Sequence, residues 1–182
     1  MNPTFTIYTG PMFGSKTTRL LGDIDRLRHK RKKVLIIKPR IDKRYSEVKI
    51  SSHNGGSVDA IAVSHGNEIL ELLEKESYSH LAVDEAFMID DIDKVLIKVF
   101  KEGVSIIVSS IQLDADERPF ENIRNIMPWA TKIEICPAVC TMCDQDAYYT
   151  KALVDIKNMT QEEKIGSQNM YEPRCFLHYD FS

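Results

Sequence analysis

A glycine-rich segment near the start of the chain, residues 10–18, constrains the fold most. It follows a short apolar run, Phe5 to Tyr8, and leads into Thr18 to His29, where leucine and isoleucine recur at helical spacing. When a strand, a tight turn and a helix follow one another, backbone N–H groups at the helix N-terminus converge on an anion. The order of these segments therefore predicts an α/β domain whose first turn binds a phosphate group.

This segment nearly matches the phosphate-loop pattern G-x-x-x-x-G-K-[ST]. Ser15 stands where the second glycine is expected, and Gly14 comes one place early. In such a loop Lys16 would contact the β- and γ-phosphates of a nucleoside triphosphate, and Thr17 would bind Mg²⁺. Either Gly14 takes over the turn or the Ser15 hydroxyl donates to a phosphate; an ordinary strand-to-helix turn is the alternative. The predicted nucleotide-binding residues are Gly10, Pro11, Met12, Phe13, Gly14, Ser15, Lys16 and Thr17.

A second apolar run ends in two acids, Asp84 and Glu85. In phosphoryl-transfer sites an aspartate at a strand end holds Mg²⁺, so we predict that Asp84 and Thr17 serve the same ion. If both acids are extended, Glu85 points away from Asp84 and is free to accept a proton from a substrate hydroxyl. The alternative is a pair of solvated acids at a strand end.

Five short apolar runs divide the first 136 residues, and most are nearly continuous rather than alternating, as in strands buried on both faces. Helix-like segments lie between several of them, which predicts an α/β domain with a mostly parallel sheet. The runs are Phe5 to Tyr8, Val34 to Ile37, Leu81 to Val83, Val104 to Ser109 and Ile133 to Cys136. We expect residues 1–136 to form this domain and residues 137–182 a separate small lobe. The polar stretch Pro39 to Ser57 reads as a long, functional loop.

The small lobe carries two metal-binding patterns, Cys140-x-x-Cys143 and Cys175-x-x-His178. Three thiolates and one imidazole suit tetrahedral Zn²⁺, and four protein ligands make a closed, structural site. The alternative is four free thiols. Cys136 is the remaining cysteine, at a predicted strand end.

Composition argues against several other classes of protein. The net charge of −3 gives no general affinity for nucleic acids or membranes. No apolar stretch is long enough to cross a membrane, and the first residues lack the layout of a signal peptide. We therefore expect a cytoplasmic protein, where thiols stay reduced and available to a metal.

Several short stretches are more specific than a phosphate loop alone requires. They are Gly10-Pro11-Met12-Phe13, Asp42-Lys43-Arg44-Tyr45-Ser46, Ser52-His53-Asn54-Gly55, Asp84-Glu85-Ala86, Arg118-Pro119-Phe120, Ala138-Val139-Cys140 and Tyr171-Glu172-Pro173-Arg174-Cys175. In this order, and over essentially the whole chain, they resemble the zinc-containing (type II) thymidine kinases, which have cytosolic, poxviral and bacterial members.

The resemblance implies ATP-dependent phosphorylation of a deoxynucleoside 5′-hydroxyl, with thymidine as the expected substrate. It implies a RecA-like domain with a zinc lobe, usually assembled as a homotetramer. Glu85 would be the general base, Arg44 would neutralise charge on the transferring phosphoryl group, and Asp84 would join the ATP site. A lasso would clamp the base. The implied substrate-binding residues are Met12, Phe87, Met88, Phe120, Glu162, Glu163, Lys164, Ile165, Gly166 and Tyr171.

The predicted base pocket departs from the family's pattern. Phe87 stands where the family usually has glutamine, Met88 where it often has an aromatic residue, and Ala115 where an aromatic packs on the base. Three interpretations stay open: a divergent thymidine kinase, such as a viral or phage member; a kinase for another or modified deoxynucleoside; and an inactive nucleotide-binding homologue.

Overall fold

The fold was examined in a computed structural model, which describes residues 2–42, 48–51, 55–156, 159–160, 163 and 168–181. The predicted catalytic residue Arg44 and the lasso residues Glu162, Lys164, Ile165 and Gly166 lie outside these described residues. Among the described residues, no helix combines the length and apolar character that crossing a membrane requires.

A six-stranded sheet forms the centre of the main domain, in the order β5-β2-β6-β7-β1-β8. All of its neighbouring strands pair in parallel, as the near-continuous apolar runs predict. The strands are β1 (Phe5–Thr9), β2 (Val34–Pro39), β5 (Ile61–Val63), β6 (His80–Asp84), β7 (Ser105–Ser109) and β8 (Lys132–Ile135). The expected α/β fold with a parallel sheet is therefore confirmed.

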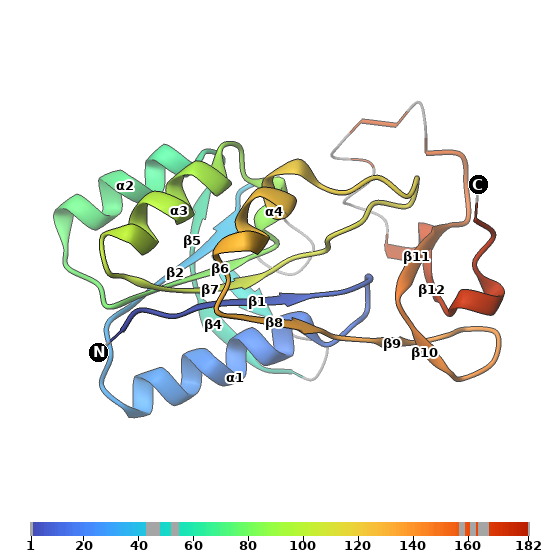
Figure 1. Cartoon of the computed structure of the whole chain (residues 1–182), viewed down its shortest axis with the longest axis horizontal. Helices are drawn as coiled ribbons and strands as arrows, with labels where there is room; N and C mark the ends of the chain where they lie inside the picture. Colours follow the sequence, from blue (N-terminus) through green and yellow to red (C-terminus); the bar gives the residue numbers. More distant parts are fainter. Residues whose placement is uncertain are drawn as a thin grey trace.

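Helices cover both faces of this sheet (Figure 1). The helix α1 (Lys16–His29) lies on one face, and α2 (Gly66–Lys75), α3 (Ile92–Lys101) and α4 (Glu121–Ile126) lie on the other. Successive residues of β7 show why the strands read as continuous apolar runs. Ile106 and Val108 join the apolar cluster beneath α2 to α4, whereas Ile107 joins the cluster beneath α1. Each strand must therefore be apolar on both sides.

The segment after β2 differs from the expected irregular loop. Two of its parts, β3 (Lys49–Ser51) and β4 (Ser57–Asp59), pair as an antiparallel hairpin. Ile50 and Val58 of this hairpin are buried in the apolar cluster that also contains α1 residues. Two buried residues on three-residue strands give too short a pattern to be recognised in a polar stretch.

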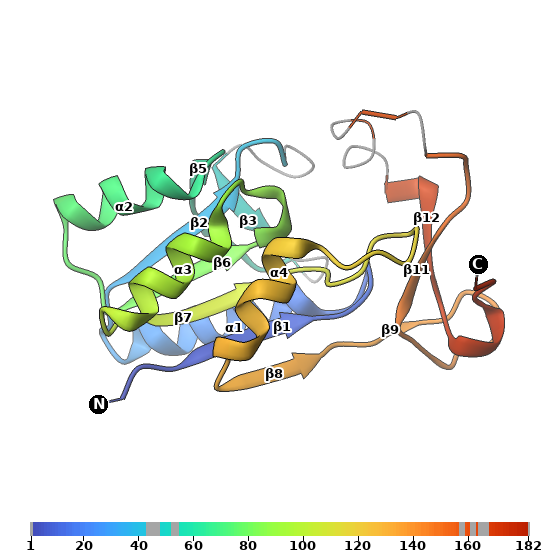
Figure 2. The same cartoon turned by 45° about the horizontal axis from the view of Figure 1, so that its top comes forward.

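A small lobe lies beyond the carboxyl ends of the parallel strands, at the right of Figure 1. It consists of two antiparallel pairs, β9 (Ala138–Val139) with β10 (Asp146–Ala147), and β11 (Tyr149–Ala152) with β12 (Tyr171–Arg174). The loop between β7 and α4 extends from the main domain toward this lobe in both views (Figure 2). The described residues also contain short 3-10 helices: η1 (Ala86–Met88), η2 (Met127–Trp129), η3 (Gln168–Met170) and η4 (Phe176–His178).

Candidate active site and metal centre

The carboxyl ends of β1, β6 and β7 bring the predicted phosphate loop and the acidic strand end together. Because these strands are parallel neighbours, their last residues lie at one edge of the sheet. Thr17, in the first turn of α1, donates a hydrogen bond from Oγ1 to Oδ1 of Asp84 at 3.1 Å. The two residues predicted to bind Mg²⁺ are thus in direct contact, although 67 positions separate them in the sequence.

The phosphate loop forms a tight turn at the N-terminus of α1. Gly10 and Phe13 adopt positive φ angles of 133° and 65°, and the helix begins at Lys16 with Ser15 as its N-cap residue. The Lys16 side chain is buried and folds back over the loop, where its Nζ donates to the Pro11 carbonyl at 2.5 Å. A cation in this position can exchange the carbonyl for a phosphate without leaving the loop.

Asp84 accepts a second hydrogen bond at the same oxygen, from Ser109 Oγ at 2.6 Å. Ser109 is fully buried at the end of β7, and no sequence pattern marks it as a functional residue. Burial of Asp84, and then the negative charge of Glu85, raise the pKa of the Asp84 carboxyl to about 7. The hydrogen bonds from Ser109 and Thr17 oppose this shift, and the charge of Asp42 adds to it.

Three carboxylates therefore gather at this edge of the sheet: Asp42, Asp84 and Glu85. Asp42 and Asp84 are both buried. Like charges in a poorly solvated place repel each other, and a divalent cation with oxygen ligands relieves that repulsion. The residues present thus fit a Mg²⁺ ion held by Asp84 and the Thr17 hydroxyl. In the sequence, Asp42 stands out only as part of one of the short stretches that carry the family resemblance.

Glu85 adopts a different backbone conformation from the extended one considered from the sequence. Its φ and ψ angles of 47° and 46° are left-handed, and it is the N-cap residue of η1. The chain therefore turns at Glu85, so the alternation of an extended strand does not set its side-chain direction. The side chain is partly buried, and its Oε2 atom is shielded from solvent. Left-handed non-glycine residues are uncommon, and they cluster at functional sites.

The residues predicted for the base pocket are only partly brought together. The rings of Phe87 and Phe120 pack at a centroid distance of 4.5 Å, and both rest against the main apolar cluster. Met88 lies beside Phe87 in η1, where its N–H donates to the Glu85 carbonyl at 3.0 Å. Glu163 is exposed, and its Oε2 atom accepts a hydrogen bond from Thr160 N–H at 2.7 Å.

The small lobe touches both loops of the site. The Oγ1 atom of Thr150, a buried residue of β11, accepts a hydrogen bond from Met12 N in the phosphate loop at 3.0 Å. The Tyr179 hydroxyl donates to the Ala115 carbonyl at 3.3 Å, in the loop between β7 and α4. Tyr171 is buried, and its burial, together with the charges of Asp116 and Asp114 in that loop, raises the pKa of its hydroxyl. Sequence reasoning missed Thr150, because a threonine in a polar strand carries no signal of a contact 138 residues away.

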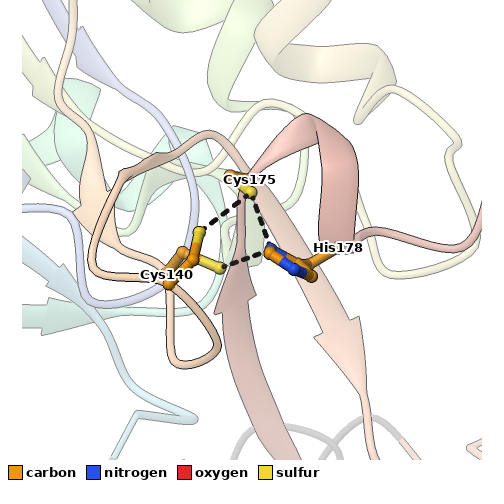
Figure 3. A group of neighbouring side chains, drawn as sticks. Cys140, Cys175 and His178 are labelled. Atoms are coloured by element: carbon orange, nitrogen blue, oxygen red, sulfur yellow. Dashed lines mark hydrogen bonds between the residues drawn. The ribbon is translucent and has the colours of Figure 1, made fainter.

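Cys140, Cys143, Cys175 and His178 converge in the lobe, as the two patterns predict. Figure 3 shows Cys140, Cys175 and His178 with their side chains pointing toward one another. Their candidate ligand atoms all lie within 4.8 Å of one another. Cys143 Sγ and Cys175 Sγ are 3.6 Å apart, and His178 Nδ1 lies 3.2 Å from Cys175 Sγ and 3.8 Å from Cys140 Sγ. Tetrahedral Zn²⁺ with ordinary bond lengths requires edges of about 3.8 Å between sulfurs and about 3.6 Å between sulfur and nitrogen. The cluster could therefore hold zinc with little adjustment, and Cys136 lies outside it.

A parallel sheet that carries a glycine-rich loop before a helix, with a buried aspartate two strands away, defines the phosphate-loop class of α/β proteins. The family model described as thymidine kinase matches residues 4–179 of the chain. The protein therefore belongs to the thymidine kinase family. It is a deoxynucleoside kinase, a phosphotransferase, and membership of the family implies the use of ATP.

We predict that metal binding depends on the four-residue cluster. Cys140→Ser and Cys175→Ser should each abolish stoichiometric zinc, because a thiolate ligand is lost, whereas Cys136→Ala should retain it. Chelation of the wild-type protein should increase hydrogen exchange in β9 to β12 far more than in the central sheet. Elemental analysis and hydrogen-exchange mass spectrometry measure these effects. A chelated protein with unchanged exchange in the lobe would contradict a structural metal.

We also predict a dependence of stability on pH that originates at Asp84. Because the folded pKa of about 7 exceeds the ordinary value of 3.8, the folded protein keeps a proton that the unfolded chain releases. The free energy of unfolding should therefore fall as pH rises from about 4 to about 7 and then level off, as far as Asp84 contributes. Asp84→Asn should remove this contribution. Urea unfolding without nucleotide or Mg²⁺, at about pH 5.5 and pH 8, should show wild type losing stability relative to Asp84→Asn at the higher pH; an equal difference at both pH values would refute the prediction.

Proposed function

We propose that this enzyme transfers the γ-phosphoryl group of ATP to the 5′-hydroxyl of thymidine, giving dTMP for nucleotide salvage and DNA synthesis. The observation that carries the proposal is the hydrogen bond between Thr17 and Asp84. It joins the phosphate loop to an acidic strand end that continues directly into Glu85. The groups that we propose to bind phosphate, to hold the metal and to accept the proton are thus neighbours at one edge of the sheet, which supports phosphoryl transfer.

On the ATP side, the chain's own groups bind and orient the polyphosphate. Backbone N–H groups of the turn between β1 and α1 surround the phosphates, and Lys16 moves its ammonium group from the Pro11 carbonyl to the β- and γ-phosphates. Thr17 and Asp84 would hold Mg²⁺, which would supply positive charge to the phosphoryl oxygens. Ser109 holds the Asp84 carboxylate in place through its hydrogen bond.

On the nucleoside side, Glu85 accepts the proton of the 5′-hydroxyl as the oxygen attacks. Its left-handed turn sets the direction of its side chain, and partial burial protects its carboxylate from bulk water. Phe87, Met88, Phe120 and Tyr171 line the base and sugar site in this proposal. Arg44 and the lasso residues 162–166 would complete the site and exclude water, following the family resemblance.

Three further properties belong to the same proposal. Zinc in the cluster of Cys140, Cys143, Cys175 and His178 is structural, since all four tetrahedral positions have a protein ligand. Cytoplasmic location is supported by these thiols, which a reducing compartment keeps available for metal. Assembly as a homotetramer is supported by family resemblance.

A second candidate function is phosphorylation of another or modified deoxynucleoside. The contact between Phe87 and Phe120 favours it, because an aromatic hydrocarbon ring cannot hydrogen-bond a base edge as glutamine can. An apolar wall at this point would discriminate bases by shape and by apolar substituents. In addition, Ala115 stands where the family has an aromatic residue, so the expected pocket lacks that ring.

The deciding experiment supplies the purified protein with ATP, Mg²⁺ and a panel of nucleosides, and detects monophosphates by chromatography and mass spectrometry. The panel contains thymidine, deoxyuridine, deoxycytidine, the purine deoxynucleosides and pyrimidines with larger 5-substituents. We expect dTMP as the main product. Monophosphate only from another nucleoside would select the second candidate. No product from any nucleoside, with ATP still bound, would contradict both candidates.

Replacement of the proposed base gives a sharper test of mechanism. Glu85→Gln should lower kcat by about 10²–10⁴-fold, since the amide cannot accept the hydroxyl proton. The Kd for ATP should change little, because the phosphate-binding groups are intact. Glu71→Gln, an exposed glutamate on α2, is the matched control and should turn over like wild type. Normal turnover by Glu85→Gln would remove Glu85 from the proposed role.

A further inference from the structure

The phosphate loop places its second glycine one position earlier than the general pattern, as Gly14-Ser15 instead of x-Gly. The structure shows that glycine is required at residue 14 and not at residue 15. The neighbours of residues 14 and 15 differ, and they explain which position must lack a side chain.

Residue 14 faces a fixed wall of backbone. A Cβ atom at Gly14 would lie 2.3 Å from the carbonyl oxygen of Cys136 and 3.3 Å from that of Pro11. A Cβ atom at Gly10 would meet the same Cys136 oxygen at 2.4 Å. The distances of 2.3 Å and 2.4 Å to the Cys136 oxygen are far below van der Waals contact, and this oxygen belongs to the backbone. The two glycines of this loop therefore pack against one carbonyl group.

The Cys136 carbonyl cannot easily move away from the loop, because the backbone at Cys136 is held in place. Cys136 lies directly after β8, and its N–H donates to the Thr9 carbonyl at 2.7 Å, which continues the pairing of β8 with β1. Its side chain is 1% exposed and packs in the apolar cluster beneath α1. A side chain at residue 14 must therefore displace the phosphate loop itself.

Residue 15 is in the opposite situation. Ser15 has φ and ψ angles of −67° and 36°, so its backbone lies outside the left-handed region that favours glycine. The residue is exposed, and its hydroxyl makes no capping hydrogen bond with α1. A side chain is thus accommodated at residue 15, where the backbone does not adopt the positive φ that favours glycine.

We infer that the Cys136 carbonyl is the positioning group of the phosphate loop and that it assigns the glycine requirement to residues 10 and 14. It follows that a serine at residue 15 is compatible with ATP binding. It also follows that placing serine at residue 14 and glycine at residue 15, as in the general pattern, weakens ATP binding. This inference rests on the proposed function, because it concerns the loop that binds ATP.

The test compares four full-length variants with wild type: Gly14→Ala, Ser15→Gly, the exchange Gly14→Ser/Ser15→Gly, and Gly22→Ala. Gly22 is the matched glycine control, since a Cβ atom there would meet nothing within 4 Å. Cys136→Ala is a fifth variant that removes the thiol and keeps the carbonyl. Calorimetric titration with MgATP gives Kd, KM for each substrate is measured separately, and thermal unfolding and bound zinc report folding.

Gly14→Ala and the exchange variant should weaken ATP binding by at least about tenfold, since small displacements of a positioning loop are costly. Their KM for the nucleoside should change much less than their KM for ATP. Gly22→Ala should bind ATP within about threefold of wild type. Ser15→Gly should gain less than about tenfold in ATP affinity, and Cys136→Ala should lose less affinity than Gly14→Ala, because it keeps the carbonyl. If Gly14→Ala fails to fold while Gly22→Ala and Ser15→Gly fold, the glycine requirement at residue 14 is still supported.

Two results would overturn the inference: ATP binding of wild-type strength by the folded exchange variant, or a gain of about tenfold or more in Ser15→Gly. The second would mean that Ser15 weakens the loop. Absence of ATP binding by the wild-type protein would instead contradict the proposed function. In that case the folding measurements on Gly14→Ala and Ser15→Gly still decide whether residue 14 must be glycine.

Discussion

The two hydrogen bonds accepted by Asp84 hold the candidate active site together. One comes from Thr17 at the start of α1 and the other from Ser109 at the end of β7, so a single oxygen connects a helix and two strands. Burying this carboxylate beside Glu85 and Asp42 is unfavourable, as the raised pKa of Asp84 shows. A divalent cation bound to the carboxylate would offset this cost. We therefore infer that Asp84 is buried there for its function and not for stability.

Much of this arrangement could be predicted because it follows from rules of local sequence. Strands buried on both faces have continuous apolar runs, and parallel strands present their carboxyl ends at one edge, which places Thr17 near Asp84. The zinc ligands could be predicted because the spacing of Cys140 and Cys143, repeated at Cys175 and His178, suits tetrahedral coordination.

The features that could not be predicted depend on distant contacts or on an unusual backbone. Ser109 and Thr150 are ordinary in sequence and gain their roles from partners 25 and 138 positions away. The left-handed turn at Glu85 has no signal, since glutamate is not favoured in that conformation. At Ser15 the sequence pattern suggests a defect, whereas the structure shows that the Cys136 carbonyl lies against Gly14 instead. The positions of glycine in a phosphate loop therefore depend on the backbone that packs against the loop as well as on the phosphate that it binds.

The lobe shows how a small metal-dependent unit can influence the chemistry of a larger domain. The buried cluster around the candidate metal ligands contains little besides Ala138, Ala147 and cysteines, so a metal would add cross-links there that apolar packing does not supply. Yet the lobe contacts the phosphate loop through Thr150 and the loop between β7 and α4 through Tyr179, the residue next to the ligand His178. A metal that orders the hairpins thereby also restrains both loops. A metal held by the four-residue cluster would thus be linked to the candidate active site through two hydrogen bonds.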